Sequence, residues 1–237
     1  MNSLVALTSP TVTMSDLKTL LAEIRTCAEQ SPFPIDSEIY EKAGKEPTQP
    51  ILYAGNLKSN ICFFGRDLGR DEVYSGQPLI GAAGKLVRQG FYRAIHHQPA
   101  KTPQELQSVC DRLLLTNTVP YKPPGNKAYE VEVKERFRPF IERLLVIYWG
   151  GNQIITLGTE AFKWFAPYAA KGEVNKFFLR PDRYTAKLPI MLRATDKGIE
   201  YQRPVTLMPL PHPSPLNQQY YAKFPGMLQQ RLAEVQF

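Results

Sequence analysis

Three separate places in the sequence carry side chains that could do chemistry together. The run Gly65-Arg66-Asp67 provides a carboxylate, Asn117 an amide, and His212 an imidazole within the proline-rich run HPSPL. A carboxylate and an imidazole are groups of general acid–base catalysis, and both can stabilise charge that develops in a transition state. An amide, with one acceptor and two donors, can recognise the polar edge of a ligand. Together these groups could bind a polar ligand and cleave a bond in it.

The elements that would position these residues are four short apolar runs, residues 61–64, 113–115, 154–157 and 205–208. Each run is too short for a helix and apolar throughout, which is typical of buried parallel strands. Helical patterns separate the runs over about 82–95 and 137–148, a third follows Gly158, and the last covers 224–235. This alternation predicts a three-layer α/β/α fold with a short, mostly parallel, four-stranded central sheet.

The candidate residues all follow predicted strands, where the sheet of such a fold binds its ligands. Asp67 lies in the loop after the first strand, Asn117 follows the second, and His212 follows the fourth. We therefore expect a carboxylate, an amide and a histidine to converge on one edge of the sheet.

A single domain is expected over residues 13–237, behind a flexible tail of residues 1–12. Thr13 and Asp16 have a spacing close to that of a capping box, and the apolar stripe after them predicts a first helix that reaches Cys27. Residues 31–50 are polar and contain proline, so we expect a loop there.

Composition and charge narrow the class of protein. The 29 Lys and Arg against 22 Asp and Glu give a net charge of +7, which favours a polyanionic partner. The sequence contains no run of 18 consecutive apolar residues, so we expect no membrane span. No basic segment precedes an apolar core at the N-terminus, so we expect no secretory signal there. Three scattered cysteines exclude a disulfide framework. We expect a reduced, cytoplasmic protein.

Ordinary structural roles remain open for each candidate. Asp67 could cap its loop by accepting backbone N–H groups, and Asn117 could end its strand in an Asx turn. Asp71 and Glu72 are lesser candidates for catalysis, and either could be merely solvated.

Several motifs in the right order resemble the uracil-DNA glycosylase superfamily over about residues 61–232. The run GQP at 76–78 with LIGAAGKL at 79–86, Asn117, and PPGN at 123–126 resemble the thermophilic family-4 branch. The run HPSPL at 212–216 is similar instead to the classical family-1 enzymes and partly to the single-strand-selective branch.

The resemblance implies a monofunctional glycosylase that flips uracil, or a related deaminated base, out of DNA and hydrolyses its N-glycosidic bond. Asp67 falls where family 1 has the carboxylate near the sugar, whereas family 4 usually has alanine there. His212 would donate to uracil O2 as the base becomes negative, and Asn117 would match the N3–H and O4 edge. The substrate-binding set is Gly65, Arg66, Leu79 and Asn117.

The resemblance also implies a set of residues that contact DNA. Leu216 matches the residue that wedges into the space left by the flipped nucleotide. Ser214 and the loop of Pro124, Gly125 and Asn126 would grip phosphates, with Lys122 beside them and Lys127 as a further partner. DNA that contains uracil is the expected partner. No membrane and no obligate protein partner are expected, and the chain is expected to be a monomer.

Two departures from the family pattern matter. Family 4 holds an iron–sulfur cluster on four cysteines. Here Cys27 matches one place, but Tyr121 and Phe137 occupy others, so we predict no cluster, no metal and no organic cofactor. Leu79 stands where the family usually stacks uracil on phenylalanine, and Arg66 replaces an acid or amide.

These departures leave two other functions open. One alternative is a catalytically degenerate protein of the same fold that binds DNA or nucleotides. The other is an unrelated α/β enzyme that acts on a nucleotide or phosphoester, although the first loop is not a Walker A motif.

Overall fold

The computed structural model describes residues 14–125 and 127–235. The predicted tail, Thr13 and the predicted phosphate contact Asn126 lie outside these described residues. Within the described part, no helix is both long and apolar enough to cross a membrane. The strands are β1 (Tyr53–Gly55), β2 (Ile61–Gly65), β3 (Leu114–Asn117), β4 (Gln153–Leu157), β5 (Leu188–Asp196) and β6 (Ile199–Leu210).

The helices of the described residues alternate with these strands. They are α1 (Met14–Gln30), α2 (Ser37–Lys42), α3 (Arg70–Ser75), α4 (Ala82–His96), α5 (Pro103–Ser108), α6 (Val131–Arg143), α7 (Thr159–Lys163), α8 (Glu173–Phe178), α9 (Gln218–Tyr221) and α10 (Phe224–Leu232). Shorter 3₁₀ turns are η1 (Val109–Asp111) and η3 (Ala166–Tyr168), and a π-helix, η2 (Leu144–Tyr148), continues α6.

Within residues 14–125 and 127–235 the sheet has six strands in the order β1-β3-β2-β4-β6-β5, so the prediction of a mostly parallel, four-stranded sheet is wrong. The four predicted strands are present and parallel at the centre, where β2 pairs with β3 and β4, and β4 pairs with β6. Two further strands close the edges in antiparallel pairs, which makes the sheet mixed.

The two edge strands have patterns that a search for apolar runs does not detect. β1 is only three residues long and half-buried. β5 alternates buried and exposed residues, because only one of its faces meets the core. β5 and β6 form a hairpin whose turn residues Lys197 (φ 49°) and Gly198 (φ 78°) both have positive φ, as a tight hairpin turn requires.

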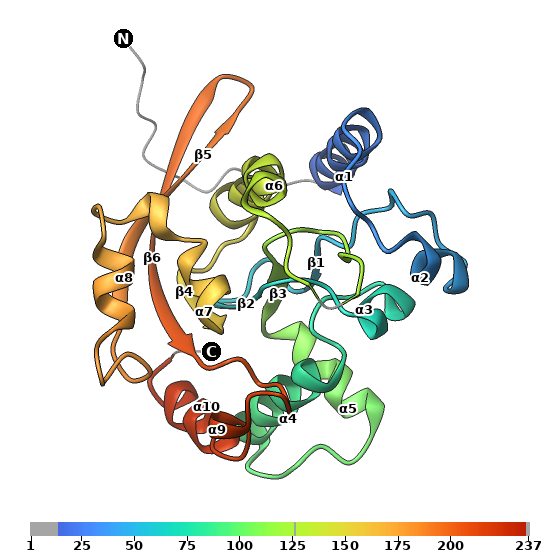
Figure 1. The fold of residues 1–237 in the computed structure, drawn as a ribbon. Helices are drawn as coiled ribbons and strands as arrows, with labels where there is room; N and C mark the ends of the chain where they lie inside the picture. Colours follow the sequence, from blue (N-terminus) through green and yellow to red (C-terminus); the bar gives the residue numbers. More distant parts are fainter. Residues whose placement is uncertain (1–13, 126, 236–237) are drawn as a thin grey trace.

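Helices pack on both faces of the sheet (Figure 1). Cys62 and Phe64 of β2 join the core with α1, α6, α7 and α8, whereas Ile61 and Phe63 join the core with α4 and α10. This alternation follows from the two-residue period of a strand, and it explains why the central strands are apolar throughout.

Two local details depart from or extend the sequence expectations. The segment 31–50 contains the short helix α2, which the polar composition did not predict. α4 and α10 pack closely at Gly90, where a Cβ would lie 2.4 Å from Leu228 Cδ2. The lack of a side chain at Gly90 therefore lets α4 lie close to α10. The N-terminal turn of α4 faces the candidate site.

Candidate active site

A cleft of about 1030 Å³ lies at the C-terminal ends of the parallel strands. The loops after β2, β3, β4 and β6 all contribute to its lining, which agrees with the predicted position of a site in a sheet of this kind. The predicted site residues that line the cleft are Gly65, Arg66, Asp67, Leu79, Asn117, Lys122, Gly125, His212, Ser214 and Leu216.

Asp67 is held almost out of solvent beside a basic neighbour. Its side chain is 5% exposed, and its Oδ2 atom lies 2.6 Å from Nε of Arg66, which is 37% exposed. Neither carboxylate oxygen has a well-directed hydrogen bond among the described residues. Burial raises the pKa of Asp67, while the positive charges of Arg66 and Lys134 oppose that rise. The Arg66 side chain and the Tyr129 backbone N–H also lie close enough to the carboxylate to lower this pKa. A buried carboxylate that lacks directed donors is prepared to bind a further group, such as a water molecule.

The backbone around Asp67 is fixed by the end of β3. Thr118 Oγ1 donates to the carbonyl of Arg66 at 2.5 Å, and the Thr118 N–H donates to the same carbonyl at 3.0 Å. Asn117 Nδ2 donates to the carbonyl of Asp67 at 3.2 Å. The loop that carries the carboxylate is therefore attached to the neighbouring strand.

Glu72 ties the same loop to the turn before α4. Its carboxylate accepts hydrogen bonds from the backbone N–H groups of Gly69 (3.0 Å), Ile80 (3.0 Å) and Gly81 (2.9 Å). Glu72 therefore has a structural role, although the sequence made it a lesser candidate for catalysis. The signal that could have revealed this role is its spacing from Gly69, which is that of a capping box.

Asn117 points its amide at the floor of the cleft. The side chain is 2% exposed, and its Oδ1 atom has no hydrogen-bond partner among the described residues. Gly65 makes room for it, because a Cβ there would lie 2.6 Å from Asn117 Nδ2. A buried amide oxygen without a donor is costly unless a ligand or water supplies one. Asn117 is thus arranged to accept a hydrogen bond from a ligand.

Leu79 borders this floor in a strained backbone conformation. Its φ is 51°, a left-handed value that is uncommon for a residue with a side chain. Arg88 Nε donates to the Leu79 carbonyl at 2.9 Å, and Gly84 approaches so closely that a Cβ there would lie 2.0 Å from that carbonyl. The fully buried Phe63 and Phe64 are core residues, so neither offers a ring to a base in the cleft.

His212 stands on the other side of the cleft, after β6. Buried prolines flank it, while the histidine itself is open to the cleft. Gly158, with φ 91°, lets the loop after β4 come close, because a Cβ there would lie 3.0 Å from His212 Cβ. Partial desolvation of the ring by the surrounding cleft walls, and then the charge of Arg66, lower the pKa of His212, so the neutral imidazole is favoured. A neutral imidazole can still donate one hydrogen bond to a ligand.

The residues predicted to contact DNA are found in different settings. Leu216 is 90% exposed at the rim of the cleft, and Ser214 is half-buried beside it. Gly125 lines the cleft, whereas the exposed Pro124 does not.

Lys122 is not presented to DNA in the way that we predicted. Its buried ammonium donates to Asp36 Oδ2 at 2.6 Å and to the carbonyls of Pro123 and Gly125, both at 2.9 Å. These three contacts use all the donors of the ammonium. Lys122 therefore shapes the proline-rich loop from inside, and Lys127 is the exposed lysine of that loop.

The residues that stand at the expected cluster positions do not fit an iron–sulfur cluster. The ring centroids of Tyr121 and Phe137 are 5.3 Å apart, and they lie 5.4 and 5.0 Å, respectively, from the ring centroid of Phe33. Aromatic rings therefore fill this region. Cys27 packs at the edge of the same core, Cys62 is buried in that core on β2, and Cys110 is buried in the core on the other face of the sheet. Among the described residues, no group of three or more His, Cys, Asp or Glu could hold a metal.

Comparison with known proteins agrees with this geometry. Two curated relatives are type-4 uracil-DNA glycosylases. The protein of Sulfurisphaera tokodaii is 29% identical over 117 residues, and that of Archaeoglobus fulgidus is 31% identical over 114 residues. These matches cover 49% and 48% of this chain, and 48% and 51% of the relatives, so the matched segment spans about half of each relative's length. Residues 52–236 match the description of the uracil DNA glycosylase superfamily, and the chain belongs to that superfamily.

Proposed function

We propose that this protein is a monofunctional uracil-DNA glycosylase that starts base excision repair by leaving an abasic site. The observation that carries the proposal is the arrangement of unsatisfied polar groups in one cleft. The Asp67 carboxylate and Asn117 Oδ1 lack well-directed partners on one side, and His212 opens into the same cleft on the other. The type-4 uracil-DNA glycosylase relatives support the same reaction.

In the proposed reaction, an extruded uracil enters the cleft with its N3–H towards Asn117 Oδ1. Cytosine has no N3–H to donate, so this contact favours uracil. The bond between N1 and C1′ breaks, and its electron pair leaves with uracil. His212 donates a hydrogen bond to O2, where part of the negative charge gathers.

The Asp67 carboxylate acts on the sugar side of the broken bond. Its negative charge stabilises the oxocarbenium character at C1′, and the carboxylate positions the attacking water. The water oxygen bonds to C1′ while the Asp67 carboxylate accepts one of the water's protons. That proton then passes to the uracil anion, so that the products are free uracil and an abasic deoxyribose. Every step uses only side chains of this chain and one water molecule.

The alternative of a degenerate binding protein has two observations in its favour. Arg66 already pairs with Asp67, and Leu79 provides no aromatic face for stacking, which is worth about 1–3 kcal/mol per base. Such a protein would bind DNA but release no base.

The test is release of uracil from labelled oligonucleotides that contain one uracil, single-stranded or opposite guanine, detected by alkali cleavage. We expect Asp67→Asn and His212→Gln to lower kcat/KM by about a thousandfold and a hundredfold, respectively. Matched controls are Asp111→Asn and His96→Gln, which change exposed residues outside the cleft lining. Binding without uracil-dependent cleavage by the wild type would overturn the enzyme in favour of the degenerate protein.

The remaining expectations belong to this proposal. A cofactor-free enzyme should contain no stoichiometric iron when purified without chelators, and iron at three or four atoms per chain would contradict that. A cytoplasmic location and a monomeric state remain predictions. Light scattering tests the monomeric state.

A further inference from the structure

The described residues that line the cleft carry no net charge. Arg66, Arg70, Lys122 and Lys127 are balanced by Asp67, Asp71, Glu72 and Glu160. The whole chain nevertheless carries +7. Because attraction to a polyanion depends on unbalanced positive charge, the surface that attracts DNA must include residues outside the cleft.

Much of the unbalanced charge lies between β4 and β5. Residues 163–187 contain six basic and two acidic side chains, which accounts for four of the seven net positive charges. We call these six basic residues the α8 surface: Lys163, Lys171, Lys176, Arg180, Arg183 and Lys187. Five of them are exposed, and Arg183 is half-buried.

Aromatic rings order the arginines of the α8 surface. The Arg180 guanidinium lies 5.2 Å from the ring centroid of Phe177. The Arg183 guanidinium lies 5.5 Å from Phe178 and 4.7 Å from Tyr184. Such stacking limits the motion of a long side chain.

Arg180 also donates to Asp182 through Nε (2.8 Å) and Nη2 (2.6 Å), and Arg183 Nη1 donates to the Arg180 carbonyl at 3.1 Å. Lys163, Lys171 and Lys176 are the lysines of this surface that form no ion pair with another described residue.

The α8 surface is connected to the cleft at both of its ends. α7, which ends at Lys163, begins with Thr159 in the cleft lining. At the other end, Arg183 Nη2 donates to Tyr220 Oη at 3.2 Å, and the rings of Tyr184 and Tyr220 are 5.3 Å apart. Tyr220 lies in α9, which directly follows the loop that carries the exposed Leu216.

We propose that the α8 surface is a second DNA-binding site, which holds backbone phosphates of the strand on one side of the extruded nucleotide. This inference rests on the proposed function and deepens it, because it gives the enzyme an asymmetric footprint. A strand that leaves the cleft past Leu216 and α9 meets the α8 surface next. Extension of the DNA in that direction should add affinity, and extension in the other direction should add less.

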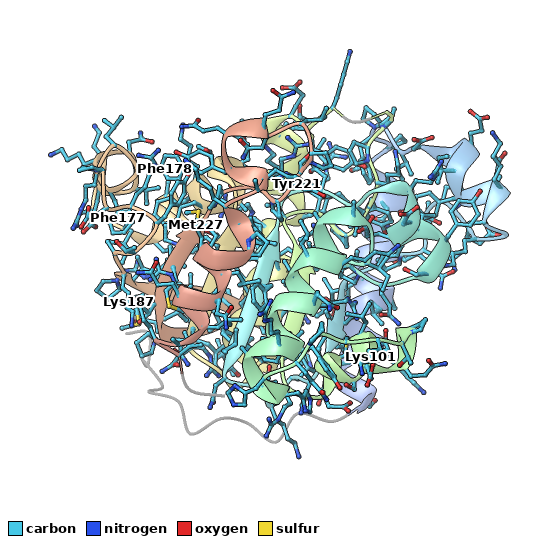
Figure 2. All side chains as sticks on the ribbon, turned by 90° about the horizontal axis from the view of Figure 1, so that it is seen from below. Lys101, Phe177, Phe178, Lys187, Tyr221 and Met227 are labelled. Carbon is cyan, nitrogen blue, oxygen red and sulfur yellow. The ribbon has the colours of Figure 1, made fainter. Side chains whose placement is uncertain are left out.

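The test compares two triple variants that remove the same charge. The first, Lys163→Gln/Lys171→Gln/Lys176→Gln, changes lysines that form no ion pair with any other described residue. The control, Arg93→Gln/Lys101→Gln/Arg112→Gln, changes exposed residues at the far end of α4, before α5 and before β3. Figure 2 shows Lys101 on the opposite side of the molecule from Phe177, Phe178 and Lys187.

Binding is measured first with single-stranded oligonucleotides that contain thymine in place of uracil, so that the readout does not depend on base release. Three oligonucleotides are used: a short central segment, the same segment extended on its 5′ side, and the same segment extended equally on its 3′ side. For the wild type we expect one extension to tighten binding about tenfold and to steepen the salt dependence by about two units of log K per log salt.

The α8 variant should lose this gain, while its affinity for the short segment and its kcat on a short uracil substrate stay unchanged. The control variant should keep the gain. Equal losses in both variants, or an equal gain from both extensions, would overturn the proposal. If the wild type releases no uracil but the one-sided gain is lost in the α8 variant, the proposed function fails and the second binding site stands.

Discussion

The two walls of the cleft are built in different ways. The Asp67 wall consists of residues 65–72, 79–84 and 117–118, and the His212 wall consists of residues 158–160 and 211–217. Hydrogen bonds in the first wall join residues far apart in the chain, such as Asn117 to Asp67 and Thr118 to Arg66, 50 and 52 positions away. In residues 211–217 of the second wall, side-chain bonds stay local: Leu216 to Ser214 and Asn217 to His212, 2 and 5 positions away. Glu160 of the same wall, in contrast, accepts a bond from Lys134, 26 positions away.

The two kinds of hydrogen bonding suit the two walls to different tasks. A carboxylate that must stabilise a developing charge needs a fixed position, and long-range hydrogen bonds provide it. A loop that must follow the shape of DNA gains from freedom, and local bonds let it move as a unit with Leu216 exposed at its tip. We infer that the Asp67 wall is prepared before DNA binds, whereas the loop of residues 211–217 in the His212 wall adjusts on binding.

The sharpest way to break this comparison is to remove Glu72, which holds two segments of the Asp67 wall together. Glu72→Ala leaves three backbone N–H groups without their acceptor. We expect kcat/KM to fall about a hundredfold, because a shift of about 1 Å in a catalytic group costs that much. Thermal denaturation should show a loss of about 2–4 kcal/mol in the free energy of unfolding.

The matched control for Glu72 is Asp71→Ala, because Asp71 is an exposed neighbour on the same helix. It should change both quantities little. If Glu72→Ala lowered stability and left kcat/KM unchanged, the Asp67 wall would not need its fixed geometry.

Two glycines, one in each wall, provide a finer comparison. Gly65→Ala places a Cβ 2.6 Å from Asn117 Nδ2, and Gly158→Ala places one 3.0 Å from His212 Cβ at a positive φ. We expect Gly65→Ala to lower kcat/KM about thirtyfold, because Asn117 in the Asp67 wall is held in place and cannot move away from the new Cβ without losing its position. Gly158→Ala should lower stability by about 1 kcal/mol through backbone strain, with a smaller loss of activity. Kinetics and thermal denaturation of both variants measure this, and the reverse order of activity losses would contradict it.

The sequence predicted the parts of the site that depend on local pattern. The four parallel strands were visible as apolar runs, and the ends of these strands brought Asp67, Asn117 and His212 to one cleft. The edge strand β5 was not predicted, because its alternating pattern does not match the pattern of a fully buried strand. The family resemblance added chemical roles to these positions, which geometry alone did not assign.

Other features depended on contacts between distant segments. Lys122 looked like a phosphate contact because it lies in a basic, proline-rich loop, but its ammonium is paired with Asp36, 86 positions away. Glu72 was a lesser candidate for catalysis, with a solvated acid as the alternative, but it accepts from residues 80 and 81 as well as from its own helix start. A single sequence does not contain the distance information that decides such pairings.

The pH dependence of activity tests how the charge of Arg66 changes the pKa values of Asp67 and His212, one in each wall. In the proposed mechanism, activity requires ionised Asp67 and neutral His212, so it is lost as the pH falls through either pKa. Burial raises the pKa of Asp67, and thus the acidic limb should lie above that of an ordinary carboxyl. Arg66→Gln removes the charge that lowers the pKa of both groups, so both pKa values should rise.

The limb should therefore move to higher pH in Arg66→Gln, with a loss of several-fold near pH 6 and a smaller change at pH 8. Profiles of kcat/KM against pH measure the shift, and Arg93→Gln, which changes a distant exposed arginine, is the control. A limb that stayed in place would show that Arg66 does not act on Asp67 through its charge.

The smallest expected effect concerns the exposed tip of the His212 wall. Leu216 is 90% exposed, so Leu216→Ala should leave the free energy of unfolding unchanged. A wedge that fills the space of an extruded nucleotide offsets part of the cost of extrusion, which is a few kcal/mol in a duplex and less in a single strand. We therefore expect kcat/KM to fall about fivefold on a duplex and less than twofold on a single strand. Equal losses on both substrates would mean that Leu216 contacts DNA without acting as a wedge, and would leave extrusion to the fixed Asp67 wall.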